Sequence, residues 1–315
     1  MTTIFQSSTP ANNPKLQYAV PDNLLKGYGT EAGTTDGVFL FRLDDSRSFP
    51  LQAAPASNAE GTILNLAKNV SAQAVLGGDV SAFTWNADRK SLTLNSRSAP
   101  RYLQSSSDFM ARFDAATHPA KNQYFALGMY VRIPSADDFV AVSTNYSGIC
   151  GTAESLTPAN EFGGIAFTNI NGTKAINAIR GTDAGALRTV AVPATNFLGK
   201  VCLVVVYRDA AGMHLYVEAT DGTKASAMTA IANVPVLTTT MTSRSLKFGV
   251  TGFYSGSLVY KHEFFGGLVD RPGNYRRFRY ACICLCGPGA TDRQRVGCRL
   301  KGVAAVSSMT AVLLH

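Results

Sequence analysis

The clearest pattern in the sequence is a hairpin between Lys200 and Thr223. An unbroken apolar run, Val201–Tyr207, precedes a short turn that ends at a glycine, and it predicts a strand buried on both faces. The next segment, Met213–Thr220, alternates strictly between apolar and polar residues, which predicts a strand with one buried face. Its polar positions are His214, Tyr216, Glu218 and Thr220. Such a pair of strands is the unit of an antiparallel β-sandwich.

Other short segments of strand character recur along the chain at intervals of about 10–15 residues, with turn residues between them. One pair is joined by Asn171-Gly172, a strong hairpin dipeptide. Residues 62–66 could form a strand or one helical turn, and residues 109–113 could form a short helical turn. The expected strands are 38–43, 82–85, 91–95, 101–104, 124–133, 139–143, 163–170, 175–180, 245–250 and 261–267. We therefore predict an all-β, antiparallel jelly-roll sandwich.

Composition divides the chain into three parts. Residues 1–35 are rich in Pro, Asn, Thr and Gly and lack periodicity, so we expect an extended N-terminal arm that is loose or laid on a partner chain. Residues 36–270 form the sandwich, with its core in 80–270, and residues 271–315 form an irregular tail. In the arm, the candidate docking residues are Phe5, Leu16 and Tyr18.

Positive charge is concentrated in the tail. Between Arg271 and Lys301 there are eight basic residues and one acid, which supply seven of the eight net positive charges of the chain. The body is thus nearly neutral, and we do not expect a nucleic-acid partner. In the tail, basic and aromatic residues interleave at 276–280, a pattern that can bind a nucleic-acid backbone, so nucleic-acid binding stays an alternative for this segment. The candidate docking residues here are Arg276, Arg277 and Arg279.

Four of the six cysteines also lie in the tail, as Cys282-x-Cys284-x-Cys286 and Cys298. Structural zinc sites use C-x₂₋₄-C pairs, so we expect free thiols, no metal and no cofactor. Cys202, inside the apolar run, is interpreted as a small buried hydrophobic residue.

Catalytic patterns are scarce. The acidic pairs Asp44-Asp45 and Asp137-Asp138 lie between strands, and neighbouring residues do not face each other as an acid and base must. The four histidines have no metal-ligand spacing, and no G-x-S-x-G motif is present,. We expect a protein that is not an enzyme. Candidate ligand-binding residues are instead the loop aromatics, which stack on sugar rings and also pack structurally: Tyr146, Phe162, Phe253 and Tyr254,.

Five segments resemble the concanavalin A-like lectin/glucanase superfamily, including its laminin-G-like branch. They are 85–94, 125–133, 200–222, 246–249 and 264–267. The resemblance implies a jelly roll of two curved antiparallel sheets that binds a ligand, often a sugar, at loops or on the concave sheet. The glucanase branch carries its catalytic carboxylates on a strand with the pattern E-x-D-x-x-E, which has no match here. The nearest candidate for the family's calcium site, a cluster of Asp and Asn on adjacent loops, is Asp137-Asp138 with Asn145, which matches it only in part.

Domains of this kind are frequent in bacteriophage virion proteins. Residues 1–6 lack the basic and apolar regions of a secretion signal,, and no apolar run reaches the length of a membrane span. We expect a virion protein assembled in the host cytoplasm, tail-associated, homo-oligomeric (a trimer favoured), in contact with other virion subunits and with a host-surface glycan. The alternatives are a capsid decoration protein and a glycan hydrolase.

Overall fold

A computed structural model gives the structure of the chain. It describes residues 39–57, 60–65, 73–77, 83–94, 101–105, 125–139, 146–152, 163–181, 187–234, 245–250, 260 and 262–270. The predicted N-terminal arm, the basic tail and the helical turn expected at 109–113 lie outside these residues. No helix among the described residues is long and apolar enough to cross a membrane.

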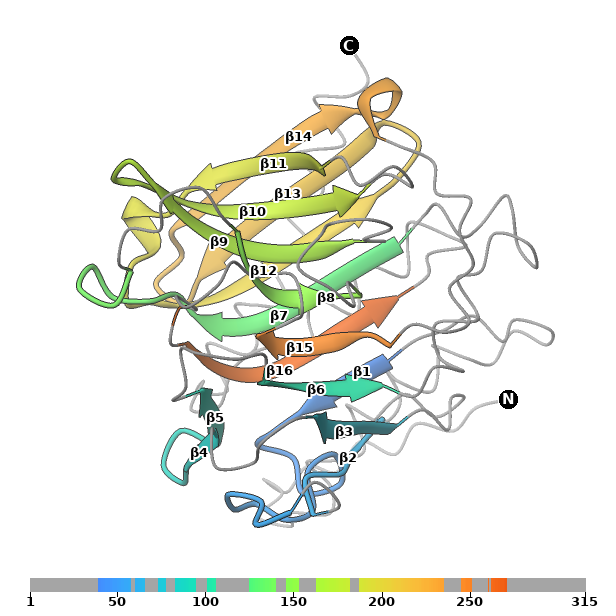
Figure 1. Ribbon diagram of the computed structural model, residues 1–315, viewed down its shortest axis with the longest axis vertical. Helices are drawn as coiled ribbons and strands as arrows, with labels where there is room; N and C mark the ends of the chain where they lie inside the picture. The colour runs from blue at the N-terminus through green and yellow to red at the C-terminus, as the bar shows by residue number, and fades with distance from the viewer. Residues whose placement is uncertain are drawn as a thin grey trace, which may run out of the picture.

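One sheet contains eight antiparallel strands and carries the predicted hairpin (Figure 1). Its order is β14-β13-β12-β7-β16-β5-β4, and β1 also pairs with β16. The strands are β1 (Phe39–Arg42), β4 (Phe83–Asn86), β5 (Ser91–Leu94), β7 (Phe125–Arg132), β12 (Val201–Arg208), β13 (Gly212–Ala219), β14 (Lys224–Ala230) and β16 (Glu263–Asp270). We call it sheet A.

The second sheet, sheet B, also has eight antiparallel strands, in the order β11-β10-β9-β8-β15-β6-β3-β2. They are β2 (Ile63–Leu64), β3 (Gln73–Gly77), β6 (Arg101–Ser105), β8 (Ser147–Gly151), β9 (Gly164–Ile170), β10 (Thr173–Gly181), β11 (Leu187–Pro193) and β15 (Lys247–Val250). Two 3₁₀ turns, Thr195–Phe197 and Ile231–Asn233, complete the regular structure of the described residues. The chain crosses repeatedly between the sheets, as in a jelly roll, so the predicted fold class is confirmed.

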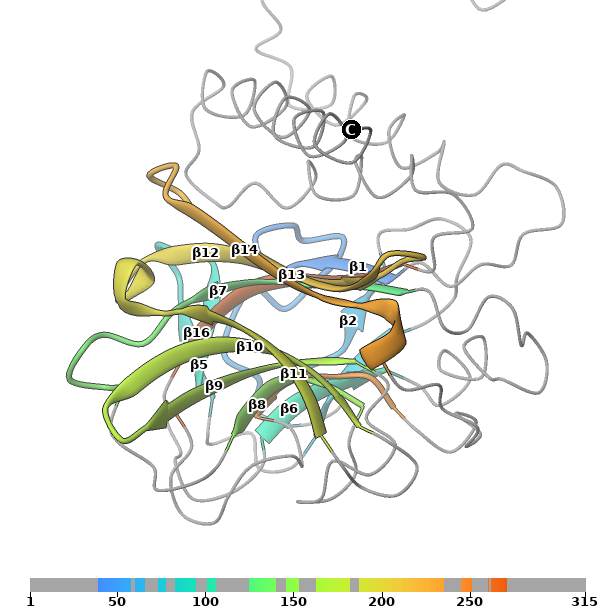
Figure 2. The same cartoon turned by 90° about the horizontal axis from the view of Figure 1, so that it is seen from above.

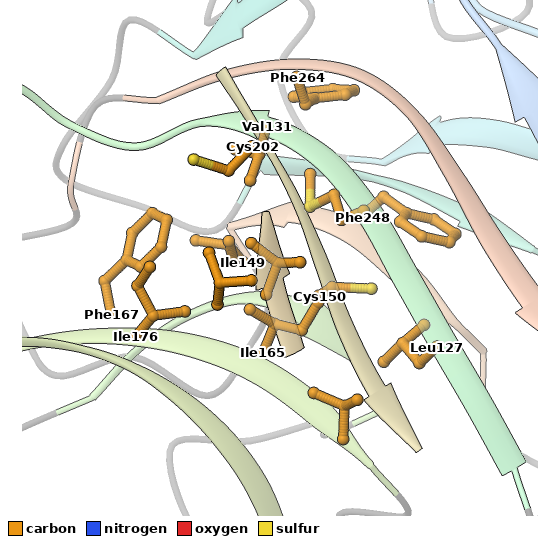
Figure 3. Packing of buried hydrophobic residues seen from close by; sticks show 14 of the residues in the cluster. Leu127, Val131, Ile149, Cys150, Ile165, Phe167, Ile176, Cys202, Phe248 and Phe264 are labelled. Carbon is orange, nitrogen blue, oxygen red and sulfur yellow. The ribbon is translucent and has the colours of Figure 1, made fainter. Parts of the chain in front are cut away.

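The two sheets form two layers with the apolar core between them (Figure 2). Alternation along β7 directs Phe125, Leu127, Met129 and Val131 into this core, as the sequence pattern predicts. Sheet B supplies apolar side chains such as Ile165 and Phe167, which pack in the same cluster (Figure 3). Each buried side chain of this size contributes about 1.5–3 kcal/mol to stability.

The hairpin has the two predicted strands, but the burial predicted for both faces of β12 is wrong for one of them. In β12, Cys202, Val204 and Val206 are fully buried, and in β13 the apolar positions face the same core. On the other face of β12, Val205 is fully buried whereas Leu203 and Tyr207 are half-buried. The apolar run therefore marks a central strand, but only one of its faces is buried along its whole length.

Two turns show where the local predictions succeeded and failed. Asn171 and Gly172 have positive φ angles of 51° and 81° and join β9 to β10, so the predicted hairpin turn is confirmed. The strand expected at 139–143 is wrong at its first residue, because Phe139 lies in a bend that closes on Ser135 and its ring is buried in the core. The remaining residues of that segment lie outside the described part. At 62–66 the structure has a strand, Ile63–Leu64.

Candidate functional site

The most promising ligand surface lies on the outer face of sheet A, where β12, β13 and β14 run side by side (Figure 1). Because alternate residues of a strand point to one face, the register of these strands places polar and aromatic side chains in rows. Tyr207, His214 and Met228 form one row, and Val205, Tyr216 and Ser226 form the next. We call the β13 surface the set Tyr207, His214, Tyr216, Glu218, Lys224, Ser226 and Met228.

The first row contains an ordered aromatic pair. The rings of Tyr207 and His214 stack with centroids 4.3 Å apart and an interplanar angle of 3°. His214 Nε2 lies 3.0 Å from Asp209 Oδ1, in the turn between the two strands. The same oxygen accepts the backbone N–H groups of Ala211 and Gly212. The β12–β13 turn and the His214 ring therefore stabilise each other, and the stacked ring of Tyr207 is fixed with them.

The charge of Asp209 is stabilised by these contacts. Burial alone would raise the pKa of its carboxyl, but His214 and the two backbone amides outweigh that effect and hold the pKa below its ordinary value. A carboxylate that accepts several N–H bonds favours its ionised form. Asp209 therefore acts as a structural anchor of the turn, with Oδ1 already used by three donors.

The second half of the β13 surface offers hydrogen-bonding groups beside an aromatic ring. Tyr216 and Glu218 lie two residues apart on one face, and the Tyr216 hydroxyl donates to Glu218 Oε2 at 2.5 Å. Both side chains are half-buried. Lys224 and Ser226, their register partners on β14, are exposed. An aromatic ring flanked by a carboxylate, an amine and a hydroxyl can stack on a sugar ring and bind its hydroxyl groups.

Met228 extends this surface to the edge of the sheet. It is the large hydrophobic side chain that stands out as exposed among the described residues, with 51% of its surface accessible. Its neighbour across the strand pair is His214. Single exposed apolar residues are common, so Met228 alone identifies no ligand, but it adds apolar contact area at the rim of the β13 surface.

A second polar cluster on sheet A is structural. The carboxylate of Glu263, which is nearly buried, lies between Arg89 Nε at 2.7 Å and Arg132 Nε at 2.8 Å, and it also accepts the Ser91 hydroxyl. Burial would raise the pKa of Glu263, but Ser91 and the two arginines hold it below its ordinary value. Three donors therefore already bind the two oxygens of this carboxylate, which leaves little of it for a ligand.

Of the ligand-binding residues expected from the sequence, Tyr146 lies in the described part. It is half-buried and packs against Ala166 and Ile179 on sheet B, and its role in ligand binding stays a prediction. Phe162, Phe253 and Tyr254 lie outside the described residues, as do the expected docking residues Phe5, Leu16, Tyr18, Arg276, Arg277 and Arg279. The structure thus leaves those predictions open.

The polar face of β13 was visible in the sequence, but its partners were not. Alternation alone placed His214, Tyr216 and Glu218 together, whereas the stacking of Tyr207 and the contact with Asp209 depend on the hairpin register. Strand β14 was missed because its sequence, KASAMTA, has few residues that favour strands,.

Potential metal ligands are not clustered in the described part of the chain. No group of three or more His, Cys, Asp and Glu side chains that could hold a metal ion occurs among these residues. Asp44 pairs with Arg42, and Asp138 accepts the Ser135 hydroxyl, as expected for loop carboxylates. His262 is buried between the sheets, with Nδ1 3.0 Å from the Tyr260 carbonyl.

Comparisons with known proteins give fold-level similarities only. A scan of protein-family models and a search of curated proteins found no match. Among solved structures, a Trypanosoma rangeli sialidase is similar at 11% identity and a TM-score of 0.46, covering 80% of this chain and 33% of the sialidase. The CBM2 module of the evolved Dit of Lactobacillus casei BL23 phage J-1 is similar at 8% identity and a TM-score of 0.39, covering 76% and 97%.

A third similar structure is lectin I-B4 from Griffonia simplicifolia, at 10% identity and a TM-score of 0.37, covering 70% of this chain and 97% of the lectin. The chain spans about a third of the length of the sialidase and glycoside hydrolase chains that it matches. With TM-scores below 0.5, none of these similarities identifies a function. The two-sheet architecture is observed, whereas membership of the concanavalin A-like superfamily stays a prediction.

Proposed function

We propose that the chain is a non-enzymatic glycan-binding protein of a bacteriophage tail, and that the β13 surface binds the glycan. The observation that carries this proposal is the combination of ordered aromatic rings and hydrogen-bonding groups on one face of β12, β13 and β14. Tyr207 is fixed by its stacking on His214, and Tyr216 by its bond to Glu218. Positions fixed in advance reduce the entropy lost when a ligand binds.

The absence of catalysis is part of the proposal and has a geometric basis. Among the described residues, the carboxylates on or beside the β13 surface are Glu218, Asp209 and Asp221. Asp221 lies in the turn after β13, where it pairs with Lys200 and accepts the backbone N–H of Thr223. His214, the partner of Asp209, and Glu218 lie four positions apart on β13, which places their Cα atoms about 13 Å apart. Glycosidases hold their two carboxyl groups about 5–9.5 Å apart. Asp209 Oδ1 also accepts from three donors, so Asp209 and Glu218 are poorly placed to act together in hydrolysis.

The virion setting is supported by the sequence features rather than by this surface. The low charge of the body, the Pro- and Asn-rich first 35 residues and the distinct basic tail fit a subunit that binds neighbouring subunits at its termini. We propose the tail as its location, with homo-oligomerisation through those termini.

Binding to an array of bacterial surface glycans tests the ligand assignment. Tyr216→Ala removes the ring from the β13 surface, and we expect it to abolish binding to any glycan that the unchanged protein retains. Thr189→Ala, at an exposed position of β11 on sheet B, is the matched control and should bind as the unchanged protein does. Equal binding by both variants would refute the β13 surface as the site.

Two further measurements separate the alternatives. Immunogold labelling of particles distinguishes tail from head, and label on the head would replace the tail assignment with capsid decoration. Release of reducing sugar from a bound polysaccharide would show that the protein is a hydrolase and would overturn the non-enzymatic part of the proposal.

A further inference from the structure

Four polar side chains are buried between the two sheets with one atom each left without a hydrogen-bond partner in the described structure. The atoms are Ser147 Oγ, Asn169 Oδ1, Tyr260 OH and His262 Nε2. The four residues are at most 3% exposed. A buried polar atom without a partner costs about 1–3 kcal/mol, so four in one region require an explanation.

These residues surround the ring of Phe167, one of the core side chains in Figure 3. Ser147 on β8 is the register partner of Phe167 on β9, and Asn169 follows on the same face two residues later. The rings of Tyr260 and His262 approach from the segment before β16, each with its centroid 6.3 Å from that of Phe167.

Further contacts link two of the four residues, Tyr260 and Asn169, directly. The Tyr260 hydroxyl lies beside the backbone amide of Asn169, without the geometry of a hydrogen bond. The Asn169 side chain in turn donates to the Phe139 carbonyl at 2.6 Å, and the Phe139 ring packs on Tyr260 with centroids 4.6 Å apart. The polar atoms therefore belong to one small region at the edge of the core.

The hydrogen-bonding capacities of the four atoms are complementary to one water molecule. His262 Nδ1 faces the Tyr260 carbonyl at 3.0 Å; a carbonyl only accepts, so Nδ1 carries the proton and Nε2 is an acceptor. Asn169 Nδ2 is the donor to Phe139, which leaves Oδ1 as a second acceptor. The Tyr260 and Ser147 hydroxyls supply two donors. A water molecule offers two donors and two acceptors and typically makes two to four bonds when buried.

We propose that this region is a binding site for one structural water molecule, which donates to His262 Nε2 and Asn169 Oδ1 and accepts from Tyr260 and Ser147. The site joins sheet B, through Ser147 and Asn169, to the segment that enters sheet A at Glu263. The lowered pKa of His262 keeps its ring neutral, and the ring must be neutral for Nε2 to accept a hydrogen bond. The proposal does not depend on the glycan-binding function.

Tyr260→Phe and Ser147→Ala test the site by the sign of the change in melting temperature. If water bridges the four groups, each substitution removes one of its partners and lowers the melting temperature by several degrees. The double variant should lose less than the sum of the two single losses, because both act on the same water. If the atoms are merely unpaired, Tyr260→Phe removes a buried polar group that has no partner and raises the melting temperature.

Ile176→Val is the matched control, because Ile176 is also a register partner of Phe167 and carries no polar atom. Its effect should add to that of Tyr260→Phe. A crystal structure gives the direct readout: a water peak within hydrogen-bond distance of the four atoms supports the proposal. Its absence, additive losses, or a raised melting temperature for Tyr260→Phe would overturn it.

Discussion

Acid should destabilise the protein through His262, and the effect can be calculated from the burial of one ring. The side chain is enclosed between the sheets, and this burial lowers its pKa from 6.5 to about 4 although the Tyr260 carbonyl partly opposes the shift. In the unfolded chain the imidazole takes up a proton near pH 6.5, whereas in the folded protein it remains neutral down to about pH 4. Stability is therefore lost as the pH falls through this window.

The magnitude follows from linkage between protonation and folding. Each pKa unit corresponds to about 1.4 kcal/mol, so the difference between 6.5 and about 4 gives a loss of about 3 kcal/mol between pH 7 and pH 4. Roughly 2 kcal/mol of this is lost by pH 5. The carboxyl groups with lowered pKa values, Asp45, Asp209 and Glu263, keep their contribution above their ordinary pKa values and lose it only at lower pH.

Urea denaturation at pH 7 and pH 5 measures this contribution, with the fluorescence of the single tryptophan, Trp85, as the signal. Trp85 packs against Phe49 with ring centroids 5.3 Å apart, so unfolding should change its emission. His262→Asn keeps a donor close to the position of Nδ1 and cannot be protonated. We expect this variant to be less stable than the unchanged protein at pH 7 but to lose about 2 kcal/mol less between pH 7 and pH 5.

His214→Asn is the control, since that ring is half-buried and bonded to Asp209. It should retain the steep acid dependence that His262 imposes. An equal loss of stability between pH 7 and pH 5 in the unchanged protein and in His262→Asn would refute the reasoning.

Three other predictions follow from the core and its charges. Glu263→Gln leaves Arg89 and Arg132 without their carboxylate and should lower the unfolding free energy by about 2–3 kcal/mol. Asp221→Asn, which breaks an exposed pair with Lys200, should lower it by less than about 1 kcal/mol. Equal losses in the two variants would contradict this prediction. Gly267→Ala places a Cβ 2.6 Å from Phe41 and against Phe248 and should lower stability by about 1–3 kcal/mol in chemical denaturation; an unchanged midpoint would show that the rings can move aside. Cys150 and Cys202 are fully buried, and burial raises the pKa of Cys202 to about 12, so iodoacetamide followed by peptide mass spectrometry should label neither thiol before urea is added; labelling of either in the native protein would refute their burial.

The sequence was a good guide to strands whose pattern is set by the core. Alternation in β7 and β13 predicted both the strands and the faces they bury, because burial on one face requires that period. The apolar run of β12 predicted the strand but overstated the burial of its second face. Strands β3, β8, β11 and β14 were not predicted. The sequences of β8 (SGICG) and β14 (KASAMTA) contain few residues that favour strands,. In β11, by contrast, Val190 and Val192 alternate toward the core, so the signal was present in the sequence.

The candidate site was predictable only in part. The polar face of β13 follows from alternation, but the contacts of Tyr207 and Asp209 with His214 depend on which residues the hairpin pairs. Tyr146 was expected among the ligand-binding loop aromatics, and the structure shows that it packs against Ala166 and Ile179. A sequence does not show whether a loop side chain folds back onto its own sheet, since that depends on the three-dimensional path of the loop.

A crystal structure of the protein with an oligosaccharide from the glycan that it retains would test the central claim most directly. The account predicts a sugar ring against Tyr216, with a sugar hydroxyl bonded to Glu218 and the ligand extending along β13 toward Tyr207. A ligand bound to the outer face of sheet B, or at a site that touches no residue of the β13 surface, would contradict it.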